Sequence, residues 1–168
     1  LLKNSEFEVE RLVTSINEQH ERVSMHGLHK ELLIAQTKSI GIPLATIELP
    51  EKTDMKTYNN IMSATTDQLL QEGFTHAAFG DIFLEDLRTY REEQLAAKGI
   101  KAVFPLWKKD TKELMHQFLQ DGFKAITVCV SNDKLGQEFV GQEVDETFLN
   151  ELPDDVDPCG ENGEFHTF

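Results

Sequence analysis

The sequence predicts an α/β fold, with a mainly parallel sheet and helices on both of its faces. Two observations carry this prediction. Stretches with apolar residues at three- and four-residue steps alternate with short apolar runs rich in β-branched or aromatic residues. Four of the periodic stretches also end in a Gly followed by an apolar residue. Strands that alternate with helices of this length are joined by right-handed crossovers, which place the strands parallel.

Each helix and strand is predicted from its own local pattern. Helical spacing occupies residues 28–35, 58–69, 84–95 and 114–119, and we expect these apolar stripes to face the core. The strand-like runs occupy residues 9–16, 44–49, 76–79, 101–104 and 125–130. The stop signals between them are Gly41-Ile42, Gly73-Phe74, Gly99-Ile100 and Gly122-Phe123. Glycine there is expected to take the left-handed conformation, and the apolar residue after it to fold back on the helix.

Length and charge limit the classes of function. A chain of 168 residues suits one α/β domain or a domain with a small appendage. It contains no apolar run of about 20 residues, so we expect no membrane span and take the cytoplasm as the default compartment. The formal net charge is −14, and neither Lys nor Arg follows Lys134. Such a surface repels phosphate backbones, which argues against general nucleic-acid binding.

Two segments carry the chemistry. Gly80-Asp81 follows a predicted strand, and ligands of open α/β sheets bind at the carboxyl ends of strands. Asp81 could hold Mg²⁺ there, or it could be the N-cap of the next helix. Residues 159–167 place Glu161, Glu164 and His166 around two glycines, and an extended backbone would point Glu164 and His166 the same way. The alternative is an acidic loop that closes a strand.

The two cysteines do not form a disulfide framework, and no Cys/His spacing matches a zinc site. Cys129 lies in an apolar run and is interpreted as a small core residue. Cys159 has no nearby cation to lower its pKa, and the acidic residues Asp157 and Glu161 beside it would raise that pKa. We therefore predict a structural role for Cys159.

Four short motifs in this order resemble the diphthine–ammonia ligase family, a branch of the N-type ATP pyrophosphatases. They are Arg-Val-Ser-Met-His-Gly at 22–27 with Gly-Ile-Pro-Leu at 41–44, Phe-Gly-Asp-Ile at 79–82 followed by Arg88, Pro-Leu-Trp at 105–107, and Gly-Glu-Asn-Gly-Glu-Phe-His-Thr at 160–167. The resemblance covers essentially the whole chain. It implies a Rossmann-like (HUP-type) ATP-binding domain over residues 1–104 and a smaller family-specific α/β substrate domain over residues 105–168.

The resemblance also implies a reaction. ATP, with Mg²⁺, adenylates a substrate carboxylate, pyrophosphate leaves, and ammonia displaces AMP to give an amide. The acceptor in the family is diphthine, a modified histidine on elongation factor 2. The sequence shows no glutaminase-type Cys/His pairing, so free ammonia is expected. Oligomeric state is left open, and a homodimer is among the assemblies that the sequence allows.

Site residues follow from the resemblance together with strand-end position. Backbone at Thr14, Ser15 and Gly80 is expected to contact adenosine, and His26 to approach the nucleotide or to have a structural role at a helix N-terminus. Asp81 would contact the nucleotide or its metal. Arg88 either leans toward the same crevice or pairs with Glu85 or Glu92.

The acceptor side is assigned to the acidic turn. Glu161, Glu164 and His166 would take a proton from ammonium before it attacks. Carboxylates, or the aromatic faces of Trp107 and Phe165, would hold the quaternary ammonium of diphthine.

One departure from the family pattern affects the prediction. The Ser-Gly-Gly-Lys-Asp-Ser type of phosphate loop does not occur in this sequence, and residues 1–4 have the composition of the helix tail that should follow it. We expect that loop upstream of Leu1, and no catalysis by the chain as written. The alternatives are a nucleotide-binding module without catalysis and an ATP pyrophosphatase that acts on a different small carboxylate.

Overall fold

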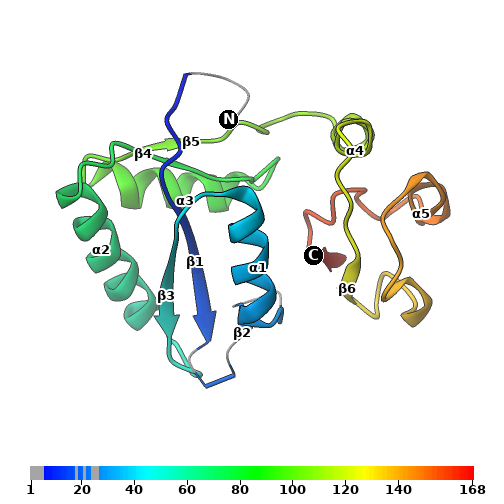
Figure 1. Ribbon diagram of the computed structural model, residues 1–168, viewed down its shortest axis with the longest axis horizontal. Helices are drawn as coiled ribbons and strands as arrows, with labels where there is room; N and C mark the ends of the chain where they lie inside the picture. The colour runs from blue at the N-terminus through cyan, green and yellow to red at the C-terminus, as the bar shows by residue number, and fades with distance from the viewer. Residues whose placement is uncertain (1–5, 18, 21, 24–26) are drawn as a thin grey trace. The chain divides into compact units, whose positions relative to one another are not determined.

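The computed structural model describes residues 6–17, 19–20, 22–23 and 27–168 (Figure 1). The chain divides into two compact units. The first consists of Leu1–Ala77 and Arg91–Val103, and the second of Ala78–Tyr90 and Phe104–Phe168. The expected helix tail at residues 1–4 lies outside the described residues.

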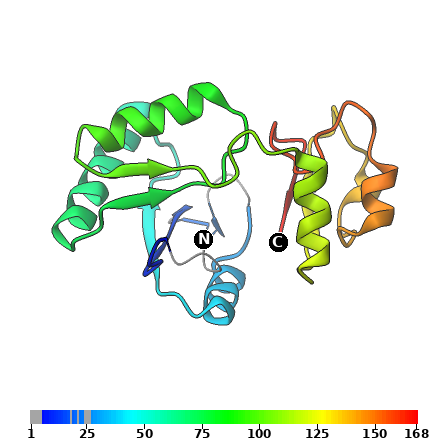
Figure 2. The same cartoon turned by 90° about the horizontal axis from the view of Figure 1, so that it is seen from above.

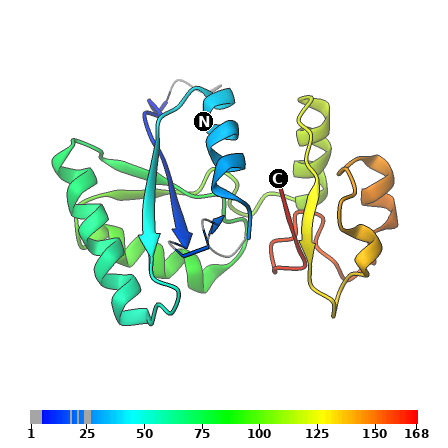
Figure 3. The ribbon, with the colours of Figure 1, turned by 60° about the horizontal axis from the view of Figure 1, so that its bottom comes forward.

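The first unit contains a three-stranded sheet with the order β2-β1-β3. Strands β1 (Leu12–Asn17) and β3 (Leu44–Leu49) are parallel, in register from Leu12 opposite Leu44 to Asn17 opposite Leu49. The short strand β2 (Arg22–Val23) pairs antiparallel with the other edge of β1. Helices α1 (Lys30–Ile40) and α2 (Met55–Gln71) lie on opposite sides of the β1–β3 pair, as Figures 1 and 3 both show.

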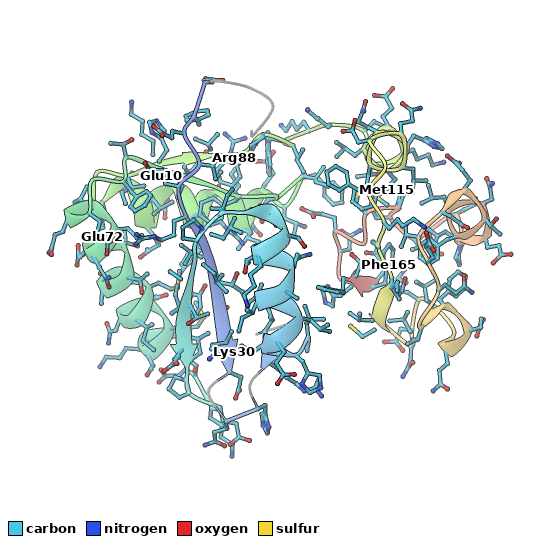
Figure 4. All side chains as sticks on the ribbon, in the orientation of Figure 1. Glu10, Lys30, Glu72, Arg88, Met115 and Phe165 are labelled. Atoms are coloured by element: carbon cyan, nitrogen blue, oxygen red, sulfur yellow. The ribbon has the colours of Figure 1, made fainter. Side chains whose placement is uncertain are left out.

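The buried cluster of this unit is small. Ile16, Val23 and Leu33 form it, with Leu28 and Leu44 packed against it. In α1 the buried positions are Leu33 and Thr37, whereas Leu32 is 41% exposed. The predicted stripe of α1 is therefore wrong by one position, because consecutive helical residues point about 100° apart. The ion pair between Arg11 and Glu72 ties the segment before β1 to the end of α2; Glu72 is labelled in Figure 4.

Strands β4 (His76–Ala78) and β5 (Lys101–Val103) form a second, two-stranded sheet, and their arrows point the same way in Figure 2. Helix α3 (Glu85–Ala96) connects them. The predicted α/β class is confirmed, with parallel pairing in small sheets. Among the described residues the strands form separate sheets of three, two and two, not one continuous sheet, and the Rossmann-like order stays a prediction.

The glycine stop signals are confirmed in detail. Gly41, Gly73, Gly99 and Gly122 all have φ between 80° and 94°. After α2, the N–H of Phe74 donates to the carbonyl of Leu69 and the N–H of Gly73 to that of Leu70. This is the bond pair of a Schellman motif, and it recurs after α3 and after helix α4 (Thr111–Gln120). At Gly41 a single bond to Thr37 gives the simpler left-handed cap.

The second unit contains α4, strand β6 (Thr127–Val130), the 3-10 turn η1 (Gln137–Phe139), helix α5 (Glu146–Glu151) and strand β7 (Phe165–Thr167). Strands β6 and β7 are antiparallel, with Cys129 opposite His166. Their shared core consists of Ala125, Leu135, Phe139, Val144, Phe148, Val156 and Phe165. Met115 of α4 packs on that core, and Figure 4 labels it together with Phe165. No helix in the described ranges combines the length and the apolar character that crossing a bilayer requires.

Candidate functional site

The segment between α5 and β7 is a tightly hydrogen-bonded loop. The Asp157 carboxylate accepts the N–H groups of Cys159 at 2.9 Å and of Glu161 at 3.3 Å. The Asp157 carbonyl accepts the N–H of Gly160 at 2.9 Å. An Asp side chain that binds the backbone after it is a common way to start a turn. These hydrogen bonds within the loop therefore give it a defined shape.

Glu164 closes this loop from its other end. Its side chain accepts the N–H of Asp157 at 3.2 Å, the N–H of Asn162 at 3.0 Å and the side-chain amide of Asn162 at 2.9 Å. Glu164 is only 3% exposed. Burial raises the pKa of Glu164, but the hydrogen bonds from Asn162 and from the backbone outweigh it, so the pKa lies below the ordinary value.

Glu161 connects the loop to a segment far away in the sequence. Its Oε1 accepts the N–H of Ile82 at 2.7 Å, across 79 residues. The carbonyl of Ile82 accepts the N–H of Lys108, also at 2.7 Å. Ile82 is 4% exposed, and Lys108 has a φ of 57°, a conformation that non-glycine residues adopt at some cost. The Gly80-Asp81-Ile82 turn is thus held from both sides within the second unit.

Arg88 lies in an aromatic cluster of the same unit. Its guanidinium carbon is 4.5 Å from the ring centroid of Trp107 and 5.0 Å from that of Phe104. Phe104 also stacks on Phe79, with ring centroids 5.6 Å apart. Glu85, one of the two pairing partners considered for Arg88, contacts the ammonium of Lys108 at 3.2 Å. Figure 4 labels Arg88.

Two segments that resemble the ligase family therefore meet in the structure, through Glu161 and Ile82. A comparison with family models finds that residues 110–168 match the diphthamide synthase C-terminal domain. The match confirms the resemblance to the diphthine–ammonia ligase family, and it points to a ligase-type enzyme with a role in diphthamide biosynthesis. No curated protein matches the chain.

The matched region, residues 110–168, contains the predicted acceptor residues, but two of them support backbone segments of the second unit. Glu164 accepts the N–H of Asn162, and Glu161 accepts the N–H of Ile82. His166 is half-buried on β7. Phe165 lies in the core with its ring edge-on to that of Phe148, centroids 5.5 Å apart. It offers no face to a cation, so the predicted cation-holding role of Phe165 is wrong.

The predicted nucleotide contacts have mixed outcomes. Gly80 is exposed, and its neighbour Asp81 is 8% exposed. Asp81 is not the N-cap of α3, because that helix begins at Glu85 and the N–H of Arg88 donates to the carbonyl of Leu84. Of the other predicted nucleotide contacts, His26 lies outside the described residues.

The predicted strand-end position of Thr14 and Ser15 is wrong. They lie inside β1, opposite Thr46 and Ile47 of β3, in the first unit. The strand continues to Asn17 because its register with β3 extends to Leu49. Strand-end position therefore no longer supports these two residues, and their contact with adenosine rests on the family resemblance.

Cys159 has the environment of an unreactive thiol. Burial, followed by the charges of Asp157, Glu161 and Asp110, raises the pKa of Cys159 to about 12. Its Sγ donates to the carbonyl of Thr111 at 3.5 Å. These contacts agree with the predicted structural role.

The part of the chain that the structure describes contains no group of three or more His, Cys, Asp or Glu placed to hold a metal ion. Mg²⁺ is commonly bound by one or two carboxylates together with substrate phosphates, and not by an all-protein cage. Asp81 supplies one carboxylate of that kind. The donor set of this segment therefore fits a metal that arrives with a nucleotide.

Proposed function

We propose that the full-length protein is an ATP-dependent amide ligase. It adenylates the carboxylate of diphthine on elongation factor 2 and transfers ammonia to it, with release of AMP and pyrophosphate. The observation that carries the proposal is the 2.7 Å bond from Ile82 N–H to Glu161, which joins the Phe-Gly-Asp-Ile motif to the motif at the end of the diphthamide synthase domain. Two family motifs that share a hydrogen bond support one shared site.

The nucleotide side of this site is assigned to residues 80, 81 and 88. A Cβ placed on Gly80 would meet nothing within 4 Å, so there is open space at this backbone position. The guanidinium of Arg88 is fixed over two aromatic rings and offers a permanent positive charge suited to phosphate. Asp81 would hold Mg²⁺. Bound ATP supplies the AMP group that makes the carboxylate oxygen a leaving group, and Mg²⁺ neutralises charge on the phosphates.

On the acceptor side, the protein has to deprotonate ammonium and exclude competing nucleophiles. Glu161 and Glu164 support backbone N–H groups, and His166 carries the imidazole, the side chain best suited to proton transfer near neutral pH, so His166 is the candidate proton acceptor. The ring of Trp107 and the acidic side chains of the loop would attract the quaternary ammonium of diphthine. The guanidinium of Arg88 already lies over the Trp107 ring, 4.5 Å from its centroid.

The test uses the full-length gene product with ATP, Mg²⁺ and ammonium, with and without elongation factor 2 that carries diphthine. The proposal expects AMP and pyrophosphate in equal amounts, and amide formation detected by mass spectrometry, only when the acceptor is present. Nucleotide binding without AMP would instead support a non-catalytic module. AMP formed with small carboxylates, but not with the elongation factor, would reassign the acceptor.

A further inference from the structure

We infer that Glu161 is a positioning residue: its carboxylate orients Asp81 by holding the Ile82 N–H, and it does not carry protons for the reaction. The inference rests on the proposed function and deepens it, since it separates the role of Glu161 from that of the acceptor-side residues. It replaces the prediction, made from the sequence, that Glu161 takes a proton from ammonium.

Glu161 binds an atom that sets the backbone conformation of Asp81. The N–H of Ile82 belongs to the peptide group that begins at Asp81, so its direction is set by the ψ angle of Asp81. The 2.7 Å bond to Glu161 therefore fixes the backbone of Asp81 itself. The bond from Lys108 N–H to the Ile82 carbonyl fixes the next peptide group. A displacement of about 1 Å at a reacting group can cost about 100-fold in rate, so such a restraint has catalytic consequences.

The loop also holds Glu161 rigidly. Its backbone N–H is held by Asp157, and Gly160 just before it has a φ of 66°. A Cβ on Gly160 would come within 2.7 Å of the Phe165 carbonyl oxygen, so only glycine lets the loop pass this close to β7. Glu164 holds the residue after Glu161 through Asn162 N–H. Restraints on both sides of Glu161 suit a fixed support.

The two roles of Glu161 also differ in the chemistry they require. A positioning role needs only an oxygen that accepts an N–H, whereas a proton carrier needs a group that titrates. Gln has a side chain of the same length, and its Oε1 can accept the Ile82 N–H. Asp keeps the negative charge but is one methylene shorter, so it falls short of Ile82. Glu161→Gln and Glu161→Asp therefore separate the two roles.

The experiment measures hydrogen exchange at the Ile82 amide in this chain, by NMR, for the wild type and for Glu161→Gln, Glu161→Asp and Glu161→Ala. Glu151, exposed at the end of α5, provides matched control variants Glu151→Gln and Glu151→Ala. We expect exchange about 10- to 100-fold faster in the Asp and Ala variants, because the amide loses a charged acceptor. We expect the Gln variant to exchange about 5-fold faster than the wild type and more slowly than the Asp and Ala variants, as a hydrogen bond to a neutral amide oxygen is roughly half as strong.

The same variants are then assayed in the full-length protein for kcat and KM. A positioning role predicts that kcat falls in parallel with Ile82 protection, so Gln retains much more activity than Asp. The inference is overturned if Asp retains more activity than Gln, or if Ile82 exchanges at the wild-type rate in the Ala variant. A wild type that forms no AMP would refute the proposed function, while the exchange rates would still show whether Glu161 holds the turn. Trp107 fluorescence verifies that each variant is folded. If Glu161→Ala unfolds, the comparison of Glu161→Asp with Glu161→Gln still separates the two roles.

Discussion

Replacing Glu164 tests whether the loop before β7 depends on a buried carboxylate. Glu164 is 3% exposed and accepts two backbone N–H groups and one side-chain amide. Ala would leave these donors without their acceptor, and an orphaned buried donor costs about 1–3 kcal/mol. The costs do not add fully, so we expect Glu164→Ala to destabilise the second unit by about 3–5 kcal/mol. Gln keeps one oxygen in place and should cost about 1–2 kcal/mol.

The assay is urea unfolding followed by the fluorescence of Trp107, the only tryptophan in the chain, which belongs to the same unit. The pH dependence provides a second test. The pKa of Glu164 is lowered in the folded protein. Its contribution is therefore fully present above the ordinary glutamate pKa of about 4.3, and it is lost as the pH falls through the lower folded pKa. The stability gap between wild type and Glu164→Gln should shrink in that acidic range and stay constant above it.

Two results would refute this reasoning. One is a Glu164→Ala variant within about 0.5 kcal/mol of the wild type, the range expected for an ordinary surface position. The other is a gap between wild type and Glu164→Gln that widens as the pH falls below the ordinary glutamate pKa. Glu151→Ala, at an exposed position of the same unit, is the matched control and should lie within that surface range.

Three further predictions concern the same unit. In urea unfolding, Gly163→Ala should destabilise the second unit by about 1 kcal/mol, because Gly163 has a positive φ. Gly160→Ala should cost more, because Gly160 also has a positive φ and a Cβ there would lie 2.7 Å from the Phe165 carbonyl oxygen. Phe148→Ala, at a position 1% exposed, should cost about 3–5 kcal/mol, against about 1 kcal/mol for Phe123→Ala at 56% exposure; equal losses would contradict the assigned core. With its pKa raised to about 12 from 9.0, Cys159 should react with iodoacetamide at pH 8 roughly a thousandfold more slowly than an ordinary thiol, and at the ordinary rate in urea.

The sequence predicted those features that depend on neighbours along the chain. The strand at 44–49 has the predicted bounds, and the glycines after three helices make the predicted Schellman bonds. Helix α5 was missed because its six residues are too few to show a helical period. Its start is nevertheless marked by Asp145, whose side chain accepts the Phe148 N–H at 2.8 Å.

The sequence did not predict the contacts that create the candidate site. Glu161 and Ile82 are 79 residues apart, and nothing in either local pattern indicates that one binds the other. The stacking of Arg88 on Trp107 is likewise a tertiary contact. Thr14 and Ser15 lie inside β1 and not at its end, because the register with β3 continues to Asn17. The residue types at the site could thus be predicted from the sequence, whereas the residues that they contact could be identified only from the folded structure.

The most direct test of the proposed amidation follows one oxygen atom. Diphthine on elongation factor 2 is labelled with ¹⁸O in its carboxylate and incubated with the full-length protein, ATP, Mg²⁺ and ammonium. If the carboxylate is adenylated and ammonia then displaces AMP, each amide formed leaves one ¹⁸O in the phosphate of AMP. Amide product accompanied by unlabelled AMP, or by ADP in place of AMP, would contradict the account.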